Sequence, residues 1–182
     1  MITDAILNFV PPFQPLSLVG AAGAAFQSQT VDLTGAGVGV APPNIIGTVS
    51  VFGSDMFVGD KEVPQFAIAI GTTFTTSTAC TLNTQVQAAA DTGSAGNYQP
   101  GTWTTLVETG YIGVTNLVKG NYLARYSWPP AFPASFQPRY FRINFQTLAG
   151  ASFTAGTIGF ALVTMARDDY SIAFAGKNFV VA

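Results

Sequence analysis

The chain offers few side chains that could do chemistry, because it has no histidine and only one cysteine, Cys80. Without histidine, Ser-His-Asp and Cys-His catalytic sites are excluded, and the commonest general base and metal ligand is missing. Cys80 shares the apolar face of a predicted strand with Leu82, so we expect a buried small hydrophobic side chain rather than a nucleophile. A single cysteine also excludes a disulfide within the chain.

The acidic residues are the remaining candidates for acid–base chemistry or metal binding. Carboxylate catalysis needs two acids separated across a cleft, but Asp168 and Asp169 are adjacent and face opposite ways in an extended chain. Residues 53–55 (GSD) lack the spacing of a Gly-x-Ser-x-Gly elbow and predict a turn. Residues 91–97 (DTGSAGN) offer oxygen ligands without the spacing of an EF-hand, and we interpret them as a flexible loop. We therefore predict no enzyme, no catalytic residue, no metal site and no cofactor.

Charged side chains are scarce, at 9% of the residues against about 25% in ordinary soluble domains. A compact chain of this molecular mass exposes on the order of 8,000 Å² of surface, which leaves roughly 500 Å² of exposed surface for each charged side chain. The mean hydropathy is +0.37, and 13% of the residues are aromatic. Such a surface is expected to be covered in part by partner molecules. The net charge of −2 gives no basic patch, and we expect no nucleic acid partner.

Two long uncharged stretches, 5–31 and 63–90, raise the question of membrane insertion. Prolines interrupt the first stretch, and a dense run of Thr, Asn and Gln interrupts the second. Neither supplies the ~20 mostly apolar residues of a spanning helix. The N-terminal sequence MITDAILNFVPP lacks the basic region of a signal peptide. We expect no membrane partner.

Segments with alternating apolar and polar residues recur between closely spaced glycines and prolines. The clearest is 79–88, and further strands are expected at 26–33, 46–52 and 65–72. The last of these is small and apolar on its second face, which indicates a strand covered on both sides. A long hairpin is expected over 139–165. We predict an all-β fold consisting of one β-sandwich of the jelly-roll type, with extended N- and C-terminal arms.

The predicted domain boundaries are an N-terminal arm over 1–25, the sandwich over 26–167 and a C-terminal arm or extra edge strand over 168–182. Both arms are apolar, and the first is rich in proline, which disfavours a central strand. Isolated apolar tails are normally disordered, so arms with several phenylalanines are expected to dock on a neighbouring subunit. The return strand of the hairpin is apolar on both faces and is expected to be buried against a partner as well. The predicted interface residues are Phe9, Phe13, Val163, Met165, Phe174 and Phe179.

Aromatic side chains leave one alternative open. A cluster of them on a β-sandwich could form a sugar-stacking platform, although packing in the core and at interfaces, where Trp and Tyr are enriched, is the favoured interpretation. The aromatic residues concerned are Tyr98, Trp103, Tyr111, Tyr122, Tyr126 and Trp128.

Three segments, in their order, resemble a family of tailed-phage capsid cement (decoration) proteins. Their sequences are PQFAIAIGTTFTTSTACTLNTQVQAA, GTWTTLVETGYIGVTNLVKGNYL and PRYFRINFQTLAGASFTAGTIGFALV. The match lies in spacing and turn chemistry, and it covers most of residues 63–163. The resemblance does not extend to the N-terminal arm or to the segment after Tyr170, whose role it leaves open.

The resemblance implies a jelly-roll protein that binds the outside of an icosahedral head, bridges subunits of the major capsid protein and stabilises the shell. The implied partners are the major capsid protein and further copies of the chain, as a dimer or trimer. The implied location is the outer capsid surface of the virion, reached after assembly in the host cytoplasm. The alternative from another class is a carbohydrate- or receptor-binding module on the virion surface. An enzyme would need a carboxylate pair formed across a pocket.

Overall fold

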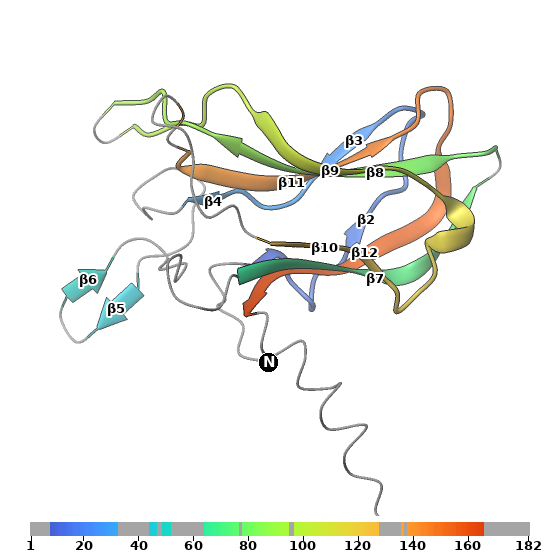
Figure 1. Ribbon diagram of the computed structural model, residues 1–182, viewed down its shortest axis with the longest axis horizontal. Coiled ribbons are helices and arrows are strands. Elements are labelled where there is room, and N and C mark those ends of the chain that lie inside the picture. Colours follow the sequence, from blue (N-terminus) through green and yellow to red (C-terminus); the bar gives the residue numbers. More distant parts are fainter. Residues whose placement is uncertain are drawn as a thin grey trace, which may run out of the picture.

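Two five-stranded antiparallel sheets lie face to face and form a β-sandwich (Figure 1). The structure is a computed structural model that describes residues 8–32, 44–46, 49–51, 64–76, 78–94, 97–127, 136 and 138–165. The first sheet has the order β1-β12-β7-β10, with β2 also paired to β12. The second sheet has the order β3-β11-β8-β9, with β4 also paired to β11. The prediction of an all-β fold is confirmed.

The strands of the first sheet are β1 (Asn8–Val10), β2 (Leu16–Ser17), β7 (Pro64–Thr76), β10 (Tyr122–Ser127) and β12 (Phe153–Met165). Those of the second are β3 (Ala25–Gln27), β4 (Val31–Asp32), β8 (Thr81–Ala89), β9 (Thr104–Gly113) and β11 (Tyr140–Thr147). The short strands β5 (Asn44–Ile46) and β6 (Val49–Val51) pair with each other. A 3-10 helix, η2 (Val114–Asn116), follows β9. The described part of the chain contains no helix long and apolar enough to cross a membrane.

The core lies between the sheets and consists of the apolar side chains that alternate along the strands and point inward. In β8 and β11 every second residue points inward, and these side chains are buried. The predicted strand at 79–88 is therefore confirmed as β8, and its predicted inward face is the buried one. On β7 the residues Phe66 to Ile70 are buried on both faces, as the small apolar second face predicted. The inward side chains of the long strands are Phe66, Ile68, Ile70, Leu82, Val86, Phe141, Ile143, Phe145 and Ile158.

The central pair of the first sheet, β7 and β12, is held unusually close by glycine. A Cβ atom added to Gly71 would lie 2.7 Å from the Cα atom of Gly159, so only glycine fits at this crossing. Four register shifts interrupt the pairing between Phe153 and Phe160. Such bulges increase the twist of a strand, which curves this long pair over the core.

The N-terminal segment differs from the predicted arm, because residues 8–25 belong to the sandwich. Strands β1 and β2 both pair with β12, and β1 is an edge strand. Pro11, Pro12 and Pro15 lie between the two strands, where no ladder hydrogen bond is lost. The segment beyond Met165, including the predicted C-terminal arm, lies outside the described residues.

Two predicted strands are each divided. The strand expected at 26–33 is split into β3 and β4, with Ser28, Gln29 and Thr30 between them. The amide of Gln29 donates a hydrogen bond of 2.9 Å to the carbonyl oxygen of Phe9, which ties the edge of the second sheet to β1 of the first. The strand expected at 46–52 is replaced by the β5–β6 pair.

Candidate functional site

The outer side of the second sheet carries an ordered array of polar side chains, which we call the polar face. Its residues come from β8, β9 and β11 and from Trp103, directly before β9. Because residues directly opposite each other in paired strands point to the same side, the register places these side chains in rows across the sheet. The polar face comprises Asn83, Gln85, Gln87, Trp103, Thr105, Glu108, Tyr111, Arg142, Asn144 and Gln146.

Three rows cross the polar face. In the middle row, Gln85 lies between Asn144 of β11 and Glu108 of β9. In the neighbouring rows, Gln87 lies between Arg142 and Thr105, and Asn83 lies between Gln146 and Tyr111. Seven of the nine side chains in these rows are thus amides or hydroxyls, at positions where most proteins place Lys and Glu.

Hydrogen bonds within and between the rows fix these side chains. The Nδ2 of Asn83 and the Nε2 of Gln85 both donate to Oε2 of Glu108, over 2.8 and 3.1 Å. The Oε1 of Gln85 accepts from the Nδ2 of Asn144 over 2.9 Å. The Nε of Arg142 donates to Oε1 of Gln87 over 2.9 Å. The face is therefore preorganised, because its amides are held in place by one another.

A bulge in β9 brings Glu108 and Tyr111 to the same side of the sheet although they are three residues apart. Asn83 pairs with Tyr111 and Gln85 with Glu108, with a register shift between the two pairs. The extra residue is accommodated at Gly110, whose φ is +71°. Glycine adopts this left-handed conformation without strain. Bulges commonly redirect a side chain in this way beside a binding site.

Glu108 and Arg142 are the two charged groups of the polar face. Hydrogen bonds from Asn83 and Gln85 hold the pKa of the Glu108 carboxyl below its ordinary value, so it is anionic at neutral pH. Desolvation lowers the pKa of the Arg142 guanidinium, and this group lies 4.2 Å from the centroid of the Trp103 ring. The stack orients the guanidinium by a cation–π interaction. Tyr111 is 56% exposed.

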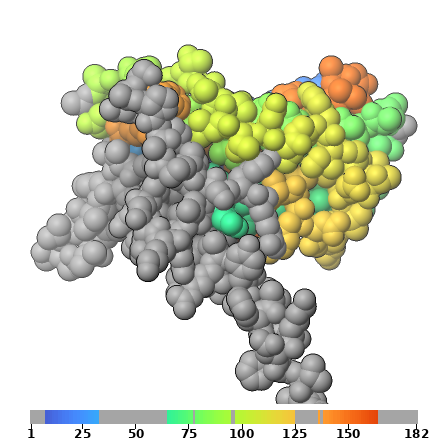
Figure 2. All heavy atoms as spheres, in the orientation of Figure 1, coloured from blue at the N-terminus to red at the C-terminus, as the bar shows by residue number. Residues whose placement is uncertain are grey.

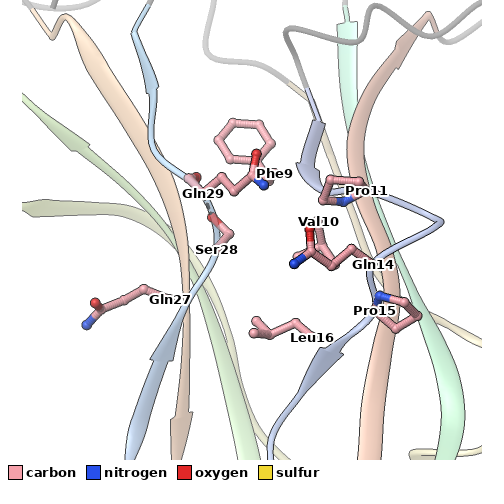
Figure 3. A pocket seen from close by; sticks show the side chains of 9 residues that line it. All are labelled: Phe9, Val10, Pro11, Gln14, Pro15, Leu16, Gln27, Ser28 and Gln29. Carbon is pink, nitrogen blue, oxygen red and sulfur yellow. Dashed lines mark hydrogen bonds between the residues drawn. The ribbon is translucent and has the colours of Figure 1, made fainter. Parts of the chain in front are cut away.

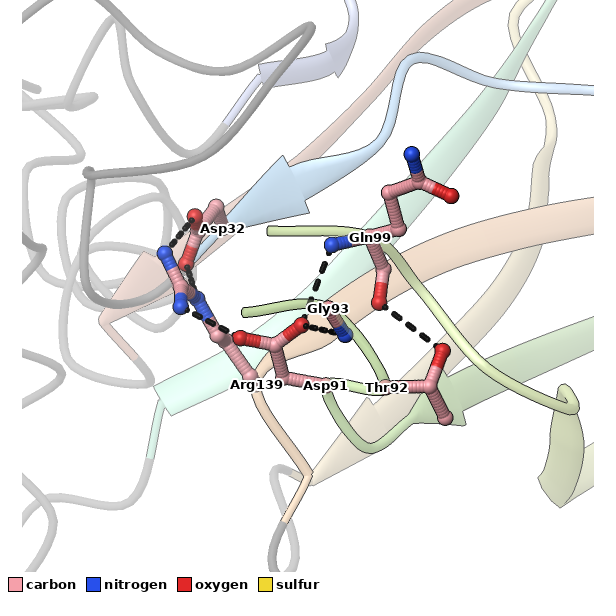
Figure 4. Close-up of polar contacts among 6 residues, drawn as sticks. All are labelled: Asp32, Asp91, Thr92, Gly93, Gln99 and Arg139. Atoms are coloured by element: carbon pink, nitrogen blue, oxygen red, sulfur yellow. Dashed lines mark hydrogen bonds and ion pairs between the residues drawn. The ribbon is translucent and has the colours of Figure 1, made fainter. Parts of the chain in front are cut away.

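A second polar cluster, which we call the clasp, holds one end of the second sheet together (Figure 4). Arg139 donates through Nε and Nη2 to the two carboxylate oxygens of Asp32, over 2.9 and 2.8 Å. Its Nη1 donates to Oδ2 of Asp91 over 2.7 Å. The guanidinium also lies 4.1 Å from the centroid of the Tyr98 ring. The clasp therefore joins β4, the loop after β8 and the start of β11.

Asp91 organises the base of the loop after β8. This part of the loop, which was predicted to be flexible, is held by hydrogen bonds to the Asp91 carboxylate. The Oδ1 of Asp91 accepts from the amides of Gly93 and Gln99, over 2.8 and 3.0 Å. Burial raises the pKa of this carboxyl, but the two amides and the Arg139 guanidinium outweigh that effect and leave the pKa below its ordinary value. Both oxygens of Asp91 are engaged within the chain. Among the described residues, no group of three or more His, Cys, Asp or Glu could hold a metal ion.

The outer side of the first sheet has a different chemistry. Tyr122 of β10 and Phe160 of β12 both lie opposite Ala69 of β7. Their rings meet edge to face with centroids 6.2 Å apart, which the small side chain of Ala69 allows. Ala67, Ala69 and Leu162 are buried, whereas Tyr122 is 40% exposed. Figure 2 shows β9 and the segment that runs to β10 side by side on one surface of the molecule.

A small cleft opens at the sandwich edge formed by β1, β2 and β3 (Figure 3). Its volume is about 150 Å³, and none of the nine described residues that line it is charged. Gln14 and Leu16 line it on the side of the first sheet, and Ser28 lines it on the other side. The hydroxyl of Ser28 donates to the carbonyl oxygen of Gln29 and accepts from the amide of Ile143, so it is committed to the backbone. The cleft therefore offers a small uncharged recess without a reactive group.

The predicted interface residues are placed differently from one another. Phe9 is fully buried in the core of the chain itself and packs on Phe66 with ring centroids 5.4 Å apart, so it is not a docking residue. Val163 faces Phe66 across the β7–β12 pair and belongs to the same core, which corrects its assignment to a partner interface. Phe13 is 85% exposed in the β1–β2 connection and remains available to a partner. Met165 pairs with Pro64 through its backbone, and Phe174 and Phe179 lie outside the described residues.

The aromatic residues considered for sugar stacking do not share one surface. Trp103 and Tyr111 lie on the polar face, Tyr98 stacks on the clasp, and Tyr122 lies on the opposite sheet. Trp128 and the side chain of Tyr126 lie outside the described part of the structure. Sequence reasoning missed Glu108, Arg142 and the clasp, because each acts through partners that are distant along the chain. The glycine of the β9 bulge was the one local signal that could have indicated the position of Tyr111.

Comparison with known proteins gives no family for the chain, because no family model matches it and no curated protein matches it.

Proposed function

We propose that the chain is a capsid cement (decoration) protein of a tailed phage. In this role it binds the outside of an icosahedral head, bridges subunits of the major capsid protein and stabilises the shell. The proposed partners are the major capsid protein and further copies of the chain, in a dimer or trimer. The proposed location is the outer surface of the virion, after assembly in the host cytoplasm.

The strand order supports a sandwich of the jelly-roll type, which is common among viral capsid proteins. A jelly roll results when a long antiparallel ribbon of four strand pairs wraps around a core. The corresponding pairs here are β1 or β2 with β12, β3 or β4 with β11, β7 with β10, and β8 with β9. Successive strands along such a ribbon alternate between sheets, as β7 and β8 do.

The observation that carries the functional proposal is the contrast between the two outer sheet surfaces. On the outer surface of the first sheet, Tyr122 and Phe160 form an aromatic pair above small side chains. The outer surface of the second sheet presents amides and hydroxyls instead. A cement subunit needs one side that packs against the shell and another that faces water. Apolar and uncharged contacts are weakly screened by salt, in contrast to surface ion pairs, which suits a particle exposed to varied ionic strength. Many copies on one shell would convert modest contacts into strong avidity.

The two exposed tyrosines on opposite sheets provide a matched test. We expect Tyr122→Ser to reduce rebinding to decoration-stripped phage heads about tenfold or more, because a buried tyrosine at an interface contributes on the order of 2 kcal/mol. Tyr111→Ser should leave rebinding unchanged. The measurement is co-sedimentation of each variant with the heads, after thermal melting has shown that both variants are folded. Equal rebinding by the wild type and Tyr122→Ser would refute this assignment of the shell-binding side.

A further inference from the structure

We propose that the polar face binds a neutral oligosaccharide, with Tyr111 as the stacking surface, Glu108 as a hydrogen-bond acceptor and Arg142 as a donor. This is a second function of the chain, on the sheet opposite the proposed shell-binding side. It does not depend on capsid binding, and it can be tested on the free chain.

Unused hydrogen-bonding capacity on the polar face is the first argument. Only Oε2 of Glu108 accepts hydrogen bonds from described residues, namely from Asn83 and Gln85, so Oε1 can accept from a ligand. Arg142 donates through Nε to Gln87, and its two terminal amino groups have no acceptor among the described residues. A sugar hydroxyl both donates and accepts, and it can therefore pair with either group.

Geometry is the second argument. Paired strands lie about 4.8 Å apart and successive rows lie roughly 7 Å apart, so Glu108 and Arg142 are about 12 Å from each other across the sheet. Tyr111 is one row from Glu108 on the same strand. The bulge at Gly110 is what brings its exposed ring to this side. The acceptor, donor and ring thus lie along a flat surface with the dimensions of a short oligosaccharide.

Preorganisation and charge select the class of ligand. Asn83, Gln85 and Gln87 are held by one another and by Glu108, so little side-chain freedom would be lost on binding. The one acidic and one basic side chain of the polar face give it no net charge. The free oxygen of Glu108 would repel a carboxylate or phosphate placed beside it. The face therefore suits an uncharged, hydroxyl-rich chain better than an acidic glycan or a nucleic acid.

The test is titration of the free full-length chain with neutral oligosaccharides of glucose, mannose and galactose, followed by NMR or calorimetry, with sialyllactose as the acidic comparison. We expect at least one neutral series to bind and sialyllactose to bind more weakly. Tyr111→Ala and Glu108→Ala should each weaken binding about tenfold. Tyr122→Ala, which removes an exposed tyrosine from the other sheet, should leave binding unchanged.

Three results would overturn the proposal. The first is the absence of binding to every neutral series, and the second is equal binding by Tyr111→Ala and the wild type. The third is a loss of head rebinding by Tyr111→Ala, which would make the polar face a protein contact. Because Tyr111 and Glu108 are both exposed, their replacement should leave the fold intact, and a thermal melt of each variant checks this.

Discussion

Replacement of Arg139 by methionine would remove the cation of the clasp while keeping a side chain of similar length. Asp32 is completely buried, and the Arg139 side chain is 11% exposed, so the pair has little access to water. Removing one partner of a buried ion pair costs about 3–5 kcal/mol, because the remaining charge stays desolvated. We expect a loss of that size in the free energy of unfolding of Arg139→Met.

Urea denaturation followed by tryptophan fluorescence would measure the loss, with the slope of the transition checked against the wild type. Arg139→Lys is the matched control, because lysine keeps the charge but lacks the planar fork that contacts both oxygens of Asp32. We expect its loss to be intermediate. Hydrogen exchange would add a local readout, since the amides of Gly93 and Gln99 donate to Asp91 and should exchange faster in Arg139→Met.

The reasoning would be refuted if Arg139→Met unfolded within about 1 kcal/mol of the wild type, which is the range of an exposed ion pair. Protection of the Gly93 and Gln99 amides at the wild-type level would refute the structural role of the clasp in the loop. A loss in Arg139→Lys equal to that in Arg139→Met would show that the geometry of the fork, rather than its charge, holds the cluster.

Three further predictions concern the core, the bulge and pH. Phe9→Ala should lower the free energy of unfolding by about 3–5 kcal/mol, whereas the exposed Phe13→Ala should change it by less than about 0.5 kcal/mol; similar values in chemical denaturation would contradict the placement of Phe9 in the core. Gly110→Ala should cost about 1–2 kcal/mol, because a left-handed φ strains alanine. Gly113→Ala, at φ −72°, should cost almost nothing, and equal melting temperatures for the two variants would argue against the bulge. The pKa of Glu108 is depressed in the folded chain, so its stabilising contribution is present above its ordinary pKa of 4.5 and is lost as pH falls below it. The urea midpoint should therefore drop as the pH falls below about 4.5, and it should drop less steeply in Glu108→Gln. Identical pH profiles of the two proteins would show that the hydrogen bonds from Asn83 and Gln85 do not stabilise the fold.

Much of the sandwich could be predicted from alternation, because β8 and β11 follow a regular period of two. Leu82 and Val86 mark the buried side of β8, and Phe141 and Phe145 mark that of β11. These strands lie in the middle of the second sheet, where one face is the core and the other is polar. Their sequence pattern therefore reports their orientation directly.

The candidate site could not be predicted in the same way, because β9 is not regular. Strict alternation would place Glu108 with the inward-packing Leu106 and put Tyr111 on the opposite side. Register shifts in the β8–β9 pairing reverse that assignment. The clasp was equally hidden, since Asp32 and Arg139 are 107 residues apart in sequence.

The N-terminal prediction was wrong for a related reason. The prolines between β1 and β2 argued against a strand in this region, yet strands of two or three residues fit on either side of them. Phe9 was therefore assigned to a docking arm, although it fills the chain's own core. Local sequence cannot show that a short edge strand has a long partner such as β12.

Mass measurement of the purified chain, alone and mixed with decoration-stripped heads of a tailed phage, tests the cement proposal most directly. The proposal predicts a small oligomer that rebinds the heads in a fixed stoichiometry and raises their melting temperature. A chain that leaves the mass and the melting temperature of the heads unchanged would contradict it.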